Sequence, residues 1–78
     1  MLLTIIFTST LTAFIAKHAA AKYYGAGFER TDFRSSPALV LGCVDRKDAE
    51  KNFMMLKEAY KRRTGRDLVN AAPIYQEL

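Results

Sequence analysis

Residues 23–43 of this chain read YYGAGFERTDFRSSPALVLGC, and this stretch joins an uncharged N-terminal segment to a charged C-terminal one. Gly25 and Gly27 favour the end of any helix that enters the stretch from the N-terminal side. Residues 23–34 are therefore predicted to form a glycine- and aromatic-rich neck loop. The fold class then depends on the segments on either side of this loop.

The segment before the loop is uncharged over residues 1–16, which read MLLTIIFTSTLTAFIA. A membrane span needs about 20 apolar residues, and the segment approaches that length if Lys17 and His18 are tolerated near its end. Lys17 can extend its ammonium group to the membrane interface, and the hydroxyl side chains can bond back to helix carbonyls. We therefore predict a transmembrane anchor over residues 1–22. The pattern leaves open whether residues 1–16 cross the bilayer fully.

Two cleaved alternatives fit this segment less well. A signal peptide begins with positive charge, and a mitochondrial presequence is rich in arginine; residues 1–16 have neither feature. Basic residues occur on the C-terminal side instead, namely Lys17, Lys22, Arg30 and Arg34. By the positive-inside rule, the C-terminal part of a single-pass protein with this pattern faces the cytoplasm-equivalent side, which is the matrix in a mitochondrion.

The part after the loop carries helix signals. A serine–proline pair predicts a short helix over Pro37–Leu41. A second helix is predicted to begin at Asp45, where Asp48 resembles the second member of a capping box, and to end near Arg63 before Gly65. Its apolar stripe consists of Ala49, Phe53, Leu56 and Tyr60.

A third and weaker helix is predicted from Asp67, although Pro73 interrupts it. Residues 35–78 are thus predicted to form a small helical domain. The fold class predicted for the whole chain is all-α: an N-terminal transmembrane helix, then a helical hairpin with a short or kinked third helix.

Composition limits the function. The chain has 78 residues, a net charge of +4 and one cysteine, Cys43. One cysteine excludes an intrachain disulfide and a cysteine-based zinc site, and we expect it to be a small buried apolar residue. The sequence shows no paired carboxylates, nucleophile–base set, metal cluster or phosphate loop, so we expect no enzymatic activity, no cofactor and no bound metal.

The basic residues near the end of the second helix are interleaved with acidic ones, and they suit the negative end of a helix dipole. We therefore expect no nucleic acid as a partner. Phe28 and Phe33, in an otherwise polar loop, either pack onto the helical domain or bind a partner. The candidate partner-binding residues are Tyr23, Tyr24, Phe28, Phe33, Lys61, Arg62 and Arg63.

The stretch 23–43 resembles the J-domain subunit of the mitochondrial presequence translocase-associated import motor. In that family an inner-membrane span leads to a segment of the type YY-x-G-G-F-E and then to an alanine-rich first helix ending in leucine-glycine. The matching residues are Tyr23, Tyr24, Gly27, Phe28, Glu29, Ala38, Leu39, Leu41 and Gly42. The resemblance implies a J-like helical domain on a membrane anchor.

The chain departs from that family at its functional motif. The family stimulates an Hsp70 chaperone through His-Pro-Asp after its second helix, whereas residues 61–63 here read KRR and the only histidine is His18. The resemblance therefore implies a degenerate J-like domain that does not stimulate Hsp70.

We accordingly expect a non-catalytic accessory subunit of a mitochondrial inner-membrane complex, such as a respiratory complex or ATP synthase. Its partners would be other subunits of that complex and membrane lipid. One alternative is a regulatory J-like subunit of the import motor that binds an active J-protein. Another is an unrelated membrane-anchored adaptor.

Overall fold

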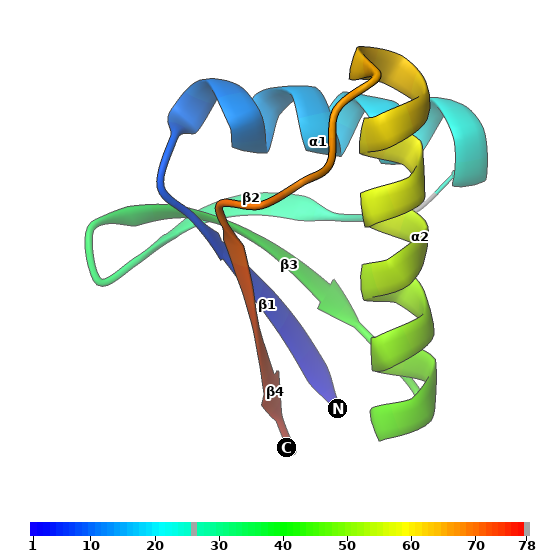
Figure 1. The fold of residues 1–78 in the computed structure, drawn as a ribbon. Helices are drawn as coiled ribbons and strands as arrows, with labels where there is room; N and C mark the ends of the chain where they lie inside the picture. Colours follow the sequence, from blue (N-terminus) through cyan, green and yellow to red (C-terminus); the bar gives the residue numbers. More distant parts are fainter. Residues whose placement is uncertain (26, 78) are drawn as a thin grey trace.

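The computed structural model describes residues 1–25 and 27–77, and it forms a two-layer α+β fold (Figure 1). The elements in chain order are β1 (Leu2–Phe7), α1 (Thr10–Tyr24), β2 (Glu29–Phe33), β3 (Ser36–Gly42), α2 (Arg46–Thr64) and β4 (Ala71–Gln76). The strands make one antiparallel sheet in the order β2-β3-β1-β4. This is the split β-α-β connectivity of ferredoxin-like folds. The predicted all-α class, and with it the J-like helical domain, is wrong.

The predicted transmembrane anchor is divided between a strand and a helix. The apolar run at the N-terminus is the central strand β1, and α1 begins after Ser9, whose Oγ accepts the amide of Thr12 at 3.4 Å. A serine in this position caps a new helix, so one continuous span cannot form. In the described residues, 1–25 and 27–77, every helix is too short or too polar to cross a membrane. This finding contradicts the predicted location, which was a single-pass protein of the mitochondrial inner membrane with its C-terminal part facing the matrix.

Two further helices of the prediction are strands. The segment Pro37–Leu41 lies within β3, where Leu39 and Leu41 pair with Ile5 and Leu3 of β1. The weak third helix is replaced by β4, in which Pro73 faces Ile5 across the ladder. Because β4 is an edge strand, the missing amide of a proline can be tolerated there.

Helix α2 confirms the predicted second helix. Asp45 is its N-cap and accepts the Asp48 amide at 2.8 Å, while Asp48 in return accepts the amide of Val44 at 3.0 Å. Gly65, in the left-handed conformation at φ 74°, ends the helix. The predicted stripe faces the core: Ala49 and Leu56 are fully buried, with Phe53 and Tyr60 packed beside them.

The core lies between the sheet and the two helices. Its largest fully buried side chains are Phe7, Leu3, Ile5, Leu39 and Leu56. Helix α1 contributes only small side chains, Ala13, Ala16 and Ala20. These alanines let α1 lie close to the sheet, and the large apolar residues of this helix, Leu11 and Phe14, remain exposed.

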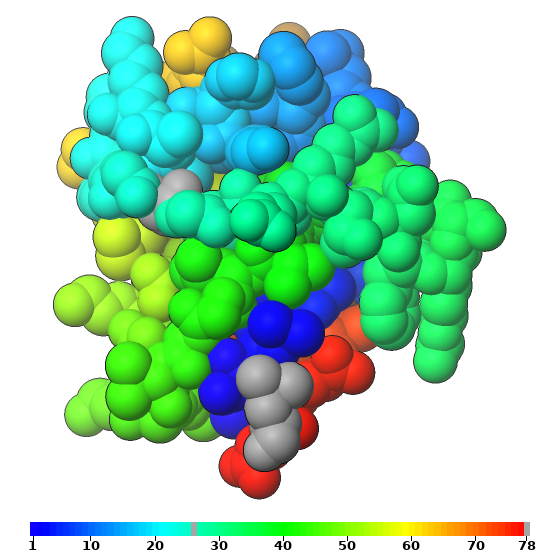
Figure 2. Space-filling view, turned by 180° about the vertical axis from the view of Figure 1, so that it is seen from behind, coloured from blue at the N-terminus to red at the C-terminus, as the bar shows by residue number. Residues whose placement is uncertain are grey.

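The other face of the sheet has no helix over it. Figure 2, which views the molecule from behind, shows atoms of the strands at the surface. On this face the neighbouring partners are Thr4 with Val40 and Ile74, and Ile6 with Ala38 and Ala72. The central strands are therefore apolar on both sides, as in sheets that are covered on both faces.

The hairpin between β2 and β3 has a two-residue turn, Arg34-Ser35, with φ of 51° and 65°. Positive φ at both positions is the type I′ geometry that favours Asn-Gly, and it costs other L-residues roughly 1–2 kcal/mol each. We expect the double substitution Arg34→Asn, Ser35→Gly to raise the free energy of unfolding by about 1–2 kcal/mol in urea titrations. Arg34→Ala keeps a Cβ at positive φ and should give no such gain; equal gains would contradict the turn geometry.

Candidate partner-binding surface

The C-terminal ends of the two helices carry five of the seven predicted partner-binding residues. Tyr23 and Tyr24 complete α1, and Lys61, Arg62 and Arg63 lie in the last turn of α2. Each helix ends at a left-handed glycine: the Gly25 amide donates to the Ala21 carbonyl at 3.2 Å, and the Gly65 amide donates to the Lys61 carbonyl at 2.7 Å. Glycine at this position needs no strained Cβ. Both helix ends are therefore sharply defined and rigidly placed.

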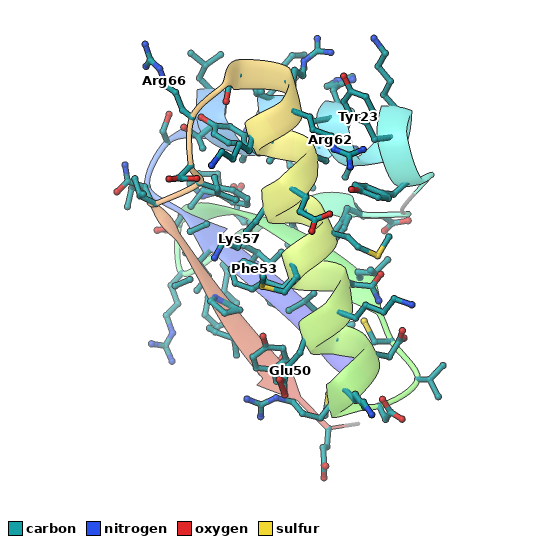
Figure 3. All side chains as sticks on the ribbon, turned by 45° about the vertical axis from the view of Figure 1, so that its right-hand side comes forward. Tyr23, Glu50, Phe53, Lys57, Arg62 and Arg66 are labelled. Carbon is teal, nitrogen blue, oxygen red and sulfur yellow. The ribbon has the colours of Figure 1, made fainter. Side chains whose placement is uncertain are left out.

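Contacts between α1 and α2 bring these ends together. The Tyr24 hydroxyl donates to Glu58 Oε2 at 2.9 Å, and the Arg62 Cζ lies 5.9 Å from the centroid of the Tyr24 ring. The hydrogen bond to Glu58 is the main reason that the pKa of Tyr24 is raised above its ordinary value. Figure 3 shows Tyr23 and Arg62 at the same end of the molecule.

The cations at this end of α2 differ in their pairing. The Lys61 Nζ lies 3.2 Å from Asp67 Oδ1 in an exposed ion pair. Arg62, Arg63 and Arg66 are exposed, and the described part of the chain gives them no salt bridge. Their guanidinium groups can therefore accept an anionic partner without first breaking an ion pair. We define the helix-end corner as Tyr23, Tyr24, Arg62, Arg63 and Arg66.

The two predicted phenylalanines lie elsewhere. Phe28 is 4% exposed and belongs to the hydrophobic core, so it packs inward and is unavailable to a partner. Phe33 ends β2 beside the hairpin turn, where the Arg34 guanidinium lies 5.3 Å from its ring centroid. The structure therefore brings the tyrosines and the α2 cations together but leaves the phenylalanines apart from them.

Cys43 is half-buried rather than fully buried. Its Sγ lies 3.7 Å from both the Leu41 carbonyl oxygen and the Asn52 Nδ2. Burial, followed by the charge of Asp48, raises the pKa of the Cys43 thiol. A thiol held in its protonated form is a weak nucleophile. His18 lies elsewhere, in a tilted contact with Phe14 in which the ring centroids are 4.3 Å apart and the ring planes meet at 54°.

A hollow of about 510 Å³ opens where β1 ends and β4 begins, beside the β2–β3 turn. Its polar lining consists of Thr8, Ser35, Ser36 and Asn70, and the rest is apolar. None of its lining side chains titrates near neutral pH, so the hollow offers no general acid or base. Within residues 1–25 and 27–77, no three His, Cys, Asp or Glu side chains gather as metal ligands.

Sequence reasoning missed three features, two of this surface and one of the sheet. Arg66 was not among the predicted residues, although it follows Gly65 and extends the same basic run. The ring of Tyr24 beside Arg62 depends on how α1 packs against α2, and no local signal in the sequence reports it. The apolar outer face of β1 and β3 was also missed, because the run LLTIIF was interpreted as lipid-facing.

No protein-family model, curated protein or solved structure matches this chain. The resemblance of residues 23–43 to the import-motor J-protein stays an untested sequence likeness, while the helical fold that it implied is replaced by the strands β2 and β3.

Proposed function

We propose that this chain is a non-catalytic accessory subunit, and that its helix-end corner docks on an acidic segment of a partner protein. The observation that carries the proposal is the exposed guanidinium of Arg62 beside the Tyr24 ring, with two further exposed arginines, Arg63 in the same last turn of α2 and Arg66 just after it. Arginine and tyrosine are enriched at protein–protein interfaces, and they supply many of the residues that dominate binding energy.

The chemistry of the rest of the molecule supports binding over catalysis. The thiol of Cys43 is held protonated, and the hollow beside the hairpin turn lacks a titratable lining. A general acid or base must reach a reacting atom from a pocket with a suitable pKa. The most developed electrostatic feature is instead an exposed cluster of cations, which suits recognition of a charged surface.

An acidic protein segment fits better than RNA. RNA-recognition modules with this strand topology stack bases on aromatic side chains of the sheet face. The central strands β1 and β3 here present Thr4, Ile6, Ala38 and Val40 on that face, none of them aromatic. The cations lie at the helix ends, away from those strands, so a stacking platform and its phosphate contacts do not coincide.

The proposal predicts a charge-specific loss of binding. Arg62→Gln, Arg63→Gln should weaken binding of a fluorescein-labelled ten-residue polyglutamate peptide at least about tenfold, because removal of interfacial charge costs both steering and contact energy. Lys47→Gln, Lys51→Gln is the matched control, since it changes the net charge equally and both lysines are exposed near the other end of α2. The control should weaken binding less than about threefold.

Fluorescence anisotropy at two salt concentrations measures these affinities, because screening should weaken a genuine ionic contact. Parallel titrations with a labelled RNA oligonucleotide and with vesicles containing anionic lipid distinguish other anions. Equal losses in the two double variants, or tighter binding of RNA or vesicles than of the peptide, would contradict the proposal.

A further inference from the structure

The uncovered face of the sheet has an apolar centre and a polar rim. Its central side chains come from three strands, and they are Leu2, Thr4, Ile6, Ala38, Val40, Ala72 and Ile74. The rim carries Glu29, Thr31 and Phe33 on β2, Ser36 on β3 and Gln76 on β4, and all but Phe33 are polar. Protein interfaces show the same arrangement of a buried apolar core inside a polar rim. We call these residues the open sheet face.

The two edge strands of the sheet, β2 and β4, carry features that oppose pairing with a strand of another molecule. The open sheet face has no such features. The edge strand β2 is highly exposed and carries Glu29, Arg30 and Asp32, whose charges oppose pairing with another strand. The opposite edge, β4, contains Pro73, which lacks a donor. Charges and proline on edge strands prevent sheets from joining side by side. An occupant of this sheet must therefore approach its face rather than its edges.

Charge favours a second copy of this chain as that occupant. The centre of the open sheet face has no charged side chain, so two such faces can meet without burying an unpaired ion. Arg62 and Arg63 lie in the last turn of α2, and Arg66 follows that helix at the same end of the molecule as Arg62 (Figure 3). In a face-to-face pair the two helical layers point outward, so the net charge of +4 per chain is held apart by the thickness of both sheets.

The size of the face fits a reversible pair. Four strands about 4.8 Å apart and about six residues long give a face of roughly 19 by 20 Å, on the order of 400 Å² in projection. Two such faces bury about twice that projected area in total, and the uneven surface of the side chains adds to this value. Stable complexes bury about 1,200–2,000 Å² in total, and weaker ones less. This estimate predicts association at micromolar or higher concentrations.

We propose that the open sheet face packs against the same face of a second copy, giving a two-fold symmetric dimer with both sheets inside and the helices outside. Thr4 and Val40 are paired across the two central strands, β1 and β3, and so lie near the middle of the contact. Such aligned packing of two sheets places them about 10 Å apart. The dimer is independent of the proposed binding of an acidic partner.

Sedimentation velocity over a protein concentration series tests the dimer. We expect the wild type to shift from monomer to dimer as concentration rises, and Val40→Glu to remain monomeric. Val44→Glu is the matched control, because Val44 is 86% exposed outside the sheet; it should dimerise like the wild type. A wild type that stays monomeric up to millimolar concentration, or a dimer that Val40→Glu leaves intact, overturns the proposal.

A second variant that strengthens the dimer is needed, because Val40→Glu could lose the dimer simply by misfolding. Thr31 is exposed on this face, where it pairs with Ala38. Thr31→Val removes a hydroxyl from the contact, so the monomer–dimer midpoint should fall to a lower concentration than that of the wild type. Circular dichroism confirms that each variant is folded. An unchanged or higher midpoint for folded Thr31→Val counts against the open sheet face as the interface.

Discussion

Leu3→Ala is expected to lower the free energy of unfolding by about 2–5 kcal/mol, the range for removing a buried leucine side chain. Leu3 is 0% exposed and sits in the central strand, paired with Leu41 on one side and Tyr75 on the other. A domain of this length has a total stability of about 4–12 kcal/mol. Truncation of this one side chain therefore removes a large share of the stability.

Urea unfolding followed by far-UV circular dichroism measures this loss, with all variants at one protein concentration because association would shift the apparent stability. Leu11→Ala is the matched control: the same side chain is removed, but Leu11 is 66% exposed on α1. Its effect should stay within about 0.5 kcal/mol. If the two variants lose equal stability, β1 is not the central strand of the sheet.

The second large effect is expected from adding volume beneath α1. Ala16 is 0% exposed and belongs to the core cluster between this helix and the sheet. Leucine at this position must push the helix outward or take a strained rotamer, which typically costs about 1–3 kcal/mol. We therefore expect Ala16→Leu to lower the free energy of unfolding, even though the substitution makes the helix more hydrophobic.

Ala21→Leu provides the control for Ala16→Leu, since Ala21 lies on the exposed side of the same helix. That variant should change the stability by no more than about 0.5 kcal/mol, as measured by the same urea titration. A destabilising Ala21→Leu together with a neutral Ala16→Leu would reverse the orientation of α1 described above.

Helix α2 could be predicted because its signals are local. All of these signals occur within residues 45–65: the cap at Asp45, the apolar stripe through Leu56 and the stop at Gly65. The strands could not be recognised in the same way. In β1 and β3 both faces are apolar, so the alternation that marks a half-buried strand is absent, and periodicity alone cannot separate such a run from a buried helix. Ser9, which ends the apolar run and caps α1, was the overlooked local signal.

The candidate surface was predictable in part. Lys61, Arg62 and Arg63 could be placed at a helix end from the sequence, because Gly65 marks that end. The position of Tyr24 beside Arg62 could not, since it follows from the close packing of α1 and α2. Packing of Phe28 against the rest of the chain was one of two alternatives that the sequence left open, and its place in the core decides between them.

The strand order determines when each strand can pair during synthesis. β1 leaves the ribosome before its neighbours in the sheet, which are residues 36–42 and 71–76. The chain must therefore extend through residue 76 before β1 is paired on both sides. Until then the segment LLTIIF has unpaired backbone groups and bare apolar side chains, which makes a nascent chain prone to aggregate. Contacts that close such long loops also slow folding. Newly made chains thus keep β1 unpaired on one side until residues 71–76 have left the ribosome, and they are suited to protection by a chaperone until that moment.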